Sequence, residues 1–166
     1  MIRLNQFNNS NFDRGASRVK ELIWMCVKAF VFQFHFPLPS AVRVFTLRCF
    51  GAKVGKGVVI RSGVNITYPW RLTLGDHCWI GEDVLILSLA QVTVGDHCCI
   101  SQRVFLCTGS HDFSKVSFDL ITRPIVIEQS CWIAACAFVG PGSTVPSGTM
   151  VKANETVAAK DIHVES

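Results

Sequence analysis

Aliphatic residues recur at every sixth position through most of the chain after residue 53. Every position of this series holds Val, Ile or Leu: Val54, Ile60, Ile66, Leu74, Ile80, Ile86, Val94, Ile100, Leu106, Ile127, Ile133, Val139, Val145, Val151 and Val157. A helical period of 3.6 cannot produce this spacing, and a strand period of two leaves the polar pairs between the aliphatic residues unexplained. A six-residue repeat is typical of a parallel β-helix, in which three hexapeptides form one triangular coil. The sequence therefore predicts an all-β parallel β-helix.

Small or medium-sized residues fill the fourth position after most members of the series. We expect them to point inward and to stack on the next coil about 4.8 Å away. These positions are Val58, Val64, Cys78, Val84, Ala90, Cys98, Val104, Ser110, Cys131, Ala137 and Ser143. The eight cysteines of the chain contain no C-x-x-C pair, which argues against zinc, and the chain is long for a disulfide-stabilised miniprotein. Cys78, Cys98 and Cys131 are instead expected to be core residues, because a buried free cysteine behaves as a small hydrophobe.

The spacing of the repeat also locates its irregularities. Val54, Leu74 and Val94 are 20 residues apart, so each early coil carries two residues beyond three hexapeptides. From Val94 to Ile127 the spacing is 33 residues, and the hexapeptide pattern breaks down over residues 109–123. We expect this segment to be a loop inserted at one corner, where a rigid scaffold commonly carries its functional residues.

Residues 1–50 precede the repeat and have a different pattern. An apolar stretch from Lys20 to Phe36 predicts a helix that ends before Pro37, and Ser40 is a candidate N-cap for a second short helix. We expect residues 1–50 to form a helical cap over the open end of a β-helix that spans residues 51–166. The alternative is that the apolar helix touches a membrane surface.

Composition and charge argue against a disordered protein, a nucleic-acid-binding protein and a membrane-spanning protein. The chain is 49% hydrophobic and 17% charged with a net charge of +4, so it is expected to fold and not to bind nucleic acid. The longest apolar run is too short to cross a bilayer and lacks a cleavage signal. We therefore expect a cytoplasmic protein, with the inner face of the membrane as the alternative location.

Four segments carry a resemblance to a known family. They are FGAKVGKG (50–57), YPWRLTLGDHCWIGE (68–82), ISQRVFLCTGSHDF (100–113) and CWIAACAFVGPG (131–142). They resemble the left-handed β-helix acyltransferases, and among these the colanic acid biosynthesis acetyltransferases, which are related to the maltose, galactoside and Nod-factor O-acetyltransferases. The resemblance covers roughly residues 10–162. It implies a left-handed coil, acetyl-CoA as co-substrate, and a homotrimer with active sites between subunits.

The resemblance assigns the catalytic role to His111, which lies 17 residues after Val94 in the phase of the family's histidine. As a general base, His111 would accept the proton of a sugar hydroxyl that attacks the thioester within a ternary complex. The alternative is a solvent-exposed loop histidine. His77 and His97 are expected to stack on one outer corner. They could form a metal site, as in the γ-class carbonic anhydrases of this fold, or simply belong to Gly-Asp turns; we expect no metal.

The other expected site residues come from the same resemblance. It places coenzyme contacts at Ala135, Ala153 and Lys160, although the relatives carry a Ser where Ala135 stands. For the acceptor it indicates the region of Asp83. Trp132 is a candidate apolar wall there, and a packed core residue or an interface residue is the alternative. The acceptor is expected to be a sugar, a nucleotide sugar or a lipid-linked oligosaccharide. Glu155 and Asp161 fall at small inward positions, so the last coil is expected to be irregular.

Two functions remain open from the sequence. The first is acetyl transfer to a sugar hydroxyl in surface polysaccharide biosynthesis. The second is a catalytically silent β-helix that serves as a scaffold, which the substituted coenzyme contacts and the irregular last coil would explain.

Overall fold

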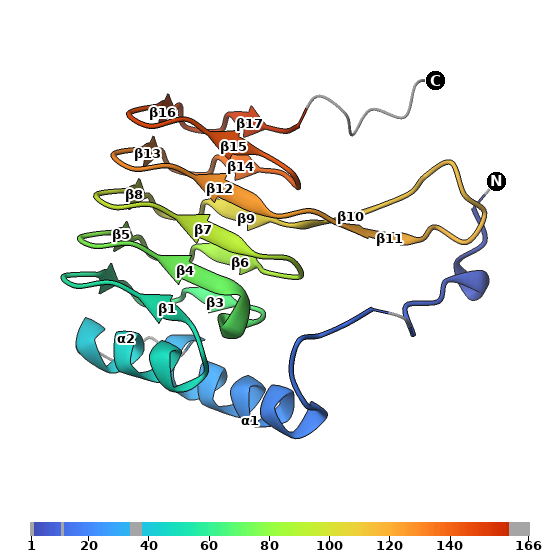
Figure 1. Ribbon diagram of the computed structural model, residues 1–166, viewed down its shortest axis with the longest axis horizontal. Helices are drawn as coiled ribbons and strands as arrows, with labels where there is room; N and C mark the ends of the chain where they lie inside the picture. Colours follow the sequence, from blue (N-terminus) through green and yellow to red (C-terminus); the bar gives the residue numbers. More distant parts are fainter. Residues whose placement is uncertain (1, 11, 34–37, 160–166) are drawn as a thin grey trace.

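The fold is a parallel β-helix whose first coil is covered by two helices (Figure 1). The structure, a computed structural model, describes residues 2–10, 12–33 and 38–159. Fifteen short strands form three parallel sheets, and each coil contributes one strand to each sheet. Sheet A contains β1 (Lys53–Val54), β4 (Leu72–Leu74), β7 (Val92–Val94), β12 (Ile125–Ile127) and β15 (Thr144–Val145). Sheet B contains β2 (Val59–Ile60), β5 (Trp79–Ile80), β8 (Cys99–Ile100), β13 (Trp132–Ile133) and β16 (Met150–Val151). Sheet C contains β3 (Asn65–Ile66), β6 (Leu85–Leu87), β9 (Phe105–Cys107), β14 (Phe138–Val139) and β17 (Thr156–Val157).

The register of the sheets confirms the six-residue period. In sheet A, for example, Val54 pairs with Leu74, Leu74 with Val94, Val94 with Ile127, and Ile127 with Val145. All fifteen aliphatic positions of the series lie in strands, and all are buried except the half-buried Val54 and Val157 of the end coils. Aliphatic side chains stacked in this way fill the interior from one coil to the next, which is why the sequence repeats.

The three equivalent cysteines are core residues, as predicted. Cys78, Cys98 and Cys131 are 1%, 1% and 2% exposed. Each thiol also donates to a carbonyl oxygen of the next coil, and the Sγ to O distance is 3.0 Å from Cys78 to Gly95 and 2.9 Å from Cys98 to Glu128. The thiols therefore link successive coils in addition to filling space.

At the corner between sheets C and A, the residues that point inward are not the ones that the repeat predicted. Ala90 and Ser110 are only half-buried, and the inward positions of this corner are taken by Ser88 and Thr108, both 0% exposed. The two extra residues of each early coil shift the inward position. The buried hydroxyls are satisfied, because Ser88 Oγ accepts from the backbone N–H of Tyr68 at 2.8 Å and Thr108 Oγ1 from that of Ala90 at 2.9 Å.

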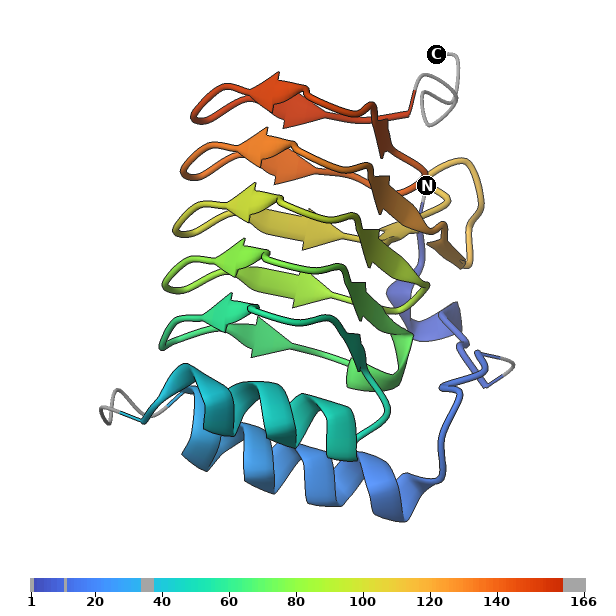
Figure 2. The same cartoon turned by 60° about the vertical axis from the view of Figure 1, so that its left-hand side comes forward.

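The helical layer lies across the end of the first coil (Figure 2). It consists of α1 (Arg18–Lys28), which continues into the π-helical turn η2 (Ala29–Gln33), and α2 (Ser40–Cys49). Trp24 and Phe32 are buried beneath the coil, and Trp24 Nε1 donates to the carbonyl oxygen of Ile66 at 3.0 Å. The hydrogen bond and the buried rings cover core side chains that the open end would expose.

The expected ends of these helices need correction. The first helix begins at Arg18, and Ser17 caps it by accepting from the backbone N–H of Lys20 at 3.2 Å. The expectation that Ser40 is an N-cap was wrong: Pro39 occupies that position, and Ser40 Oγ accepts from the backbone N–H of Ile60 at 2.7 Å. Ser40 therefore joins the second helix to the first coil. The expected helix end at Phe36 lies outside the described residues.

The last described coil is more regular than expected. Glu155 is exposed, and its Oε2 accepts from the backbone N–H of Lys152 at 2.7 Å, so its side chain turns outward and closes a tight turn. Asp161 lies outside the described residues. In the described part of the chain, no helix combines the length and the apolar character that a membrane span requires.

Candidate active site

The segment inserted after residue 108 is an antiparallel hairpin that projects from the corner between sheets C and A (Figure 1). Its strands are β10 (Gly109–His111) and β11 (Leu120–Thr122), and His111 pairs with Leu120. The sequence located this insertion correctly but predicted a loop, because three-residue strands without alternation leave no periodic signal. Hydrogen bonds close the tip of the hairpin: Asp112 Oδ1 accepts from the backbone N–H of Ser114 at 3.0 Å, and the Asp112 N–H donates to the carbonyl oxygen of Asp119 at 2.8 Å.

His111 is held by Phe118 from the opposite side of the hairpin. The two rings are stacked, with centroids 4.3 Å apart and planes 1° apart. His111 Nδ1 lies 2.9 Å from the carbonyl oxygen of Phe118. A carbonyl oxygen only accepts, so Nδ1 carries the proton, and in the neutral imidazole Nε2 has a free lone pair. The contact thus fixes the tautomer that a general base requires.

The backbone of Phe118 is in an unusual conformation that places its carbonyl group at His111. Its φ is +51°, in the left-handed region that bulky residues rarely adopt. Such conformations persist where the surrounding structure enforces them, and they cluster at functional sites. No sequence signal distinguishes Phe118 from the other aromatic residues of the chain, so its contact with His111 could not be predicted from the sequence.

The N-terminal strap, residues 2–15 without residue 11, runs from the hairpin toward the helical cap. The Arg3 N–H donates to the carbonyl oxygen of Val116 at 2.9 Å, and the Phe7 ring meets His111 edge-on with centroids 5.5 Å apart. Near the other end, Trp70 Nε1 donates to the carbonyl oxygen of Arg14 at 2.7 Å. The strap therefore covers one side of His111, which the sequence did not predict.

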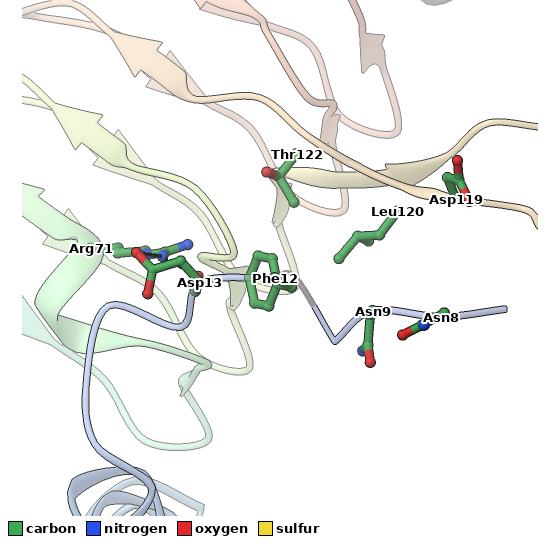
Figure 3. A pocket seen from close by; sticks show the side chains of 8 residues that line it. All are labelled: Asn8, Asn9, Phe12, Asp13, Arg71, Asp119, Leu120 and Thr122. Carbon is green, nitrogen blue, oxygen red and sulfur yellow. Dashed lines mark hydrogen bonds and ion pairs between the residues drawn. The ribbon is translucent and has the colours of Figure 1, made fainter.

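A pocket of about 420 Å³ lies between the strap, the hairpin and the second coil (Figure 3). It is lined by Asn8, Asn9, Phe12, Asp13, Arg71, Asp119, Leu120 and Thr122. Leu120 is the strand partner of His111, so the pocket lies beside the histidine. Side-chain amides, carboxylates, a guanidinium and an aromatic ring together suit a ligand with several hydroxyl groups, because they offer both donors and acceptors.

The charged groups of the pocket are held in place. Arg71 donates to the carbonyl oxygen of Asp13, and its guanidinium lies 5.4 Å from the centre of the Phe12 ring. Hydrogen bonds from Ser117 and Lys115 lower the pKa of Asp119, so this carboxylate stays ionised near neutral pH. The amide-rich sequence of residues 5–13, which ends in Asp13, was the only sign of this pocket in the sequence.

The residues expected to contact the coenzyme lie at a different corner. Ala135 and Ala153 occupy the corner between sheets B and C in consecutive coils, where the Asn154 N–H donates to the carbonyl oxygen of Ala135 at 3.0 Å. Asp83 lies at the same corner with a φ of +57°, and its Oδ2 is 3.9 Å from Arg103 Nε. Lys160 lies outside the described residues. Within one chain, Ala135 therefore lies close to Ala153, but both lie at a different corner of the coil from the hairpin that carries His111.

Trp132 lies on the outer face of sheet B, the side of the triangular coil opposite the hairpin corner. It pairs with Cys99 and Met150 in the neighbouring coils, and its Nε1 donates to Ser101 Oγ at 2.9 Å. Its side chain is 49% exposed, so it is not a core residue. Within one chain, Trp132 is therefore separate from the pocket beside His111.

His77 and His97 stack as expected, with ring centroids 5.3 Å apart. Both adopt a left-handed backbone, with φ values of +55° and +57°, at the corner between sheets A and B, which supports the turn interpretation. Among residues 2–10, 12–33 and 38–159, no group of three or more His, Cys, Asp or Glu side chains is placed to hold a metal ion.

Solved structures share this architecture. The hexapeptide-repeat acetyltransferase VCA0836 of Vibrio cholerae O1 biovar eltor, solved with acetyl coenzyme A, matches 95% of this chain and 88% of its own with a TM-score of 0.77 and 24% identity. A maltose O-acetyltransferase from Clostridium difficile 630 matches 84% of this chain and 79% of its own with a TM-score of 0.68 and 19% identity. The fold is thus the hexapeptide-repeat β-helix of these acetyltransferases.

Sequence similarity narrows the class to one family. No family model matches the chain. One relative is a protein of Escherichia coli (strain K12) that bears the name colanic acid biosynthesis acetyltransferase WcaF. It is 47% identical to this chain over 144 residues, which are 87% of this chain and 79% of the relative. The chain belongs to this family of hexapeptide-repeat acetyltransferases, as the sequence motifs predicted.

Proposed function

We propose that the protein transfers the acetyl group of acetyl-CoA to a hydroxyl group of a sugar, with His111 as general base. The observation that carries the proposal is the hydrogen bond between His111 Nδ1 and the carbonyl oxygen of Phe118, which leaves Nε2 free to accept a proton. The relatives named above support the acetyl donor and the polysaccharide context. The pocket beside His111 supports a polyhydroxylated acceptor.

The reaction needs no acyl-enzyme, because the thioester is already activated. The acceptor oxygen attacks the carbonyl carbon of the acetyl group while its proton passes to His111 Nε2. When the tetrahedral intermediate collapses, the carbon–sulfur bond breaks, and the coenzyme thiolate takes the proton from the imidazolium. The products are the sugar acetyl ester, free coenzyme A and a neutral His111, so the base is regenerated in each cycle.

We also propose that the complete site forms between subunits of a homotrimer. The residues expected to contact the coenzyme and the acceptor, Ala135, Ala153, Asp83 and Trp132, lie on parts of the coil away from the hairpin. A neighbouring copy would bring them to His111. The exposed side chains of Trp79, Trp132 and Met150 form an apolar stripe along sheet B, and such a stripe is typical of an interface.

The decisive experiment is a mass-spectrometric screen for acetyl transfer from acetyl-CoA to nucleotide sugars and lipid-linked oligosaccharides. We expect one acceptor to gain an acetyl group in a reaction that releases coenzyme A and that His111→Ala slows by about 10²–10⁴-fold. A wild-type protein that neither transfers nor hydrolyses the acetyl group with any acceptor would instead support the catalytically silent scaffold.

A further inference from the structure

The helical cap has a second apolar face, which points away from the β-helix. Along α1 and η2, Val19, Leu22, Ile23 and Phe30 recur at helical spacing on the side opposite the buried Trp24. Their side chains are 64%, 61%, 51% and 74% exposed. A helix that caps a core needs only one apolar face, so the outer face requires another explanation.

The second helix extends this outer face. On α2, Phe45 and Val42 are 68% and 39% exposed, while Val44 and Leu47 of the same helix pack against the first coil. The two helices lie side by side across the end of the molecule (Figure 2). We define the basal face by its outward side chains: Val19, Leu22, Ile23, Met25, Phe30, Val42 and Phe45. Among the described residues, these are half of the large hydrophobic side chains that are strongly exposed.

Charge is also concentrated at this end. Residues 14–61, which form the helical cap and the start of the first coil, contain nine of the sixteen Lys and Arg residues but only one of the twelve Asp and Glu residues. Arg18, Lys53 and Lys56 are exposed there. The rest of the chain is therefore net negative, although the whole chain carries only +4. Arg43 is buried and Arg61 is paired with Glu82, but the other seven cations of this segment still outnumber its one carboxylate.

We infer that the basal face docks on a lipid surface that contains anionic lipids. The apolar side chains would enter the boundary between headgroups and acyl chains, and the surrounding Lys and Arg side chains would meet lipid phosphates. A second copy of the chain is a poorer occupant, because end-to-end packing of two basal faces would bring two positively charged ends together. The cytoplasmic leaflet is anionic, so docking would place the protein at the inner face of the membrane.

Docking on lipid does not depend on the proposed reaction, but the proposed trimer and a lipid-linked acceptor would both favour it. In a trimer whose subunits pack side by side with parallel coils, all three basal faces would point in the same direction. Three weak contacts then act together and bind more tightly than one. If the acceptor is lipid-linked, docking also concentrates the enzyme at the surface that carries the acceptor.

The test is co-sedimentation of the full chain with vesicles, which requires no acceptor and no activity. We expect binding to vesicles of phosphatidylglycerol and phosphatidylethanolamine, little binding to phosphatidylcholine vesicles, and weaker binding as salt increases. Leu22→Ser combined with Phe30→Ser should lower the partition coefficient at least about tenfold. Lys53→Gln and Lys56→Gln should each lower it about fivefold.

Matched variants on other parts of the molecule serve as controls. Phe113 in the hairpin is 74% exposed, the same as Phe30, so Phe113→Ser should leave vesicle binding unchanged. Lys152→Gln in the last coil is the control for the charge variants. Circular dichroism should show that every variant keeps the fold of the wild type.

Two results would overturn the inference. One is an absence of wild-type binding to anionic vesicles, or an equal loss of binding for the basal variants and their controls. The other is a concentration-dependent doubling of the particle mass that the Leu22→Ser and Phe30→Ser double variant abolishes, without vesicle binding. That result would assign the basal face to contact between copies of the chain.

Discussion

The imidazole of His111 lies flat on the ring of Phe118, and its Nδ1 binds the carbonyl oxygen of the same residue at 2.9 Å. One residue thus orients His111 in two ways, through its ring and through its backbone. The hydrogen bond selects the tautomer, and the stacked ring restricts rotation of the imidazole. If His111 is the base, Phe118 is a positioning residue whose side chain and backbone can be tested separately.

The first prediction concerns His111 itself. His111→Ala should lower kcat by about 10²–10⁴-fold, the usual contribution of positioned proton transfer. Binding of coenzyme A, measured by calorimetry, should change little. His97→Ala, a stacked corner histidine, should stay within a few-fold of the wild type. Equal losses for the two variants, or rescue by added zinc, would favour a metal site instead.

The second prediction concerns the ring of Phe118. Phe118→Ala keeps the backbone carbonyl but removes the stacked ring, so kcat should fall by about 2–10-fold while KM for acetyl-CoA stays the same. Phe118→Tyr preserves the stack and should restore most of the rate. A rise in KM with unchanged kcat would show that Phe118 contributes to substrate binding and not to the orientation of His111.

The third prediction concerns the pocket beside His111. Arg71→Gln removes the cation beside Asp13 and Phe12, so KM for the acceptor should rise about tenfold, as expected for one lost charged hydrogen bond. Initial-rate kinetics with varied acceptor would measure it, and KM for acetyl-CoA should not change. Arg61→Gln is the control, because it breaks an exposed ion pair between Arg61 of the first coil and Glu82 of the second coil. Similar effects of both variants on KM for the acceptor would show that the acceptor does not bind in this pocket.

The fourth prediction concerns the buried cysteines. Burial raises the pKa of Cys98 to about 11, and it also raises the pKa of Cys78. Because thiolates react and thiols do not, both should resist thiol reagents at pH 8 in the native protein and react after denaturation. The exposed Cys26, Cys49 and Cys136 should react first. Mass spectrometry of labelled peptides would decide this, and rapid native labelling of Cys98 would contradict the inward register.

The same pKa shift predicts how stability depends on pH. The Cys98 thiol ionises near pH 9 in the unfolded chain but near pH 11 in the folded protein. Below pH 9 both states are protonated, so Cys98 has no effect on the pH dependence. Between about pH 9 and 11 only the unfolded state loses the proton, and the free energy of unfolding should fall. Urea titrations at pH 8 and pH 10 should show a smaller decrease for Cys98→Ala than for the wild type.

The fifth prediction concerns assembly. Light scattering should give the mass of three chains, and Trp79→Ser combined with Trp132→Ser should shift the protein toward the monomer, because both side chains are half-exposed on sheet B. Activity should fall in the same variant if the site is shared between subunits. A wild-type monomer at micromolar concentration would contradict both the trimer and the shared site.

The sequence by itself determined the β-helix, the strands of its coils and the inward residues at two of its three corners. The aliphatic residue at every sixth position is a local signal that each coil repeats, so residues such as Ile80 and Ile100 could be paired without any structure. The break in the repeat located the insertion, and the resemblance to the acyltransferase family singled out His111 within it. The helical cap followed from the change of pattern before residue 51, but its ends and the Ser40 cap were misplaced, and residues 2–10 and 12–15 form the strap beside the hairpin instead of part of the cap.

Only the tertiary structure decided how the site is built around His111. The contacts of Phe7 with His111 and of Arg3 with Val116 join residues more than 100 positions apart, and no period relates them. The left-handed backbone of Phe118 depends on the hairpin that encloses it. Likewise, Ser88 replaces Ala90 in the core because two extra residues are accommodated at a corner, which depends on how the coils stack. A repeat specifies what each coil shares with its neighbours, whereas the site lies where one coil departs from the repeat.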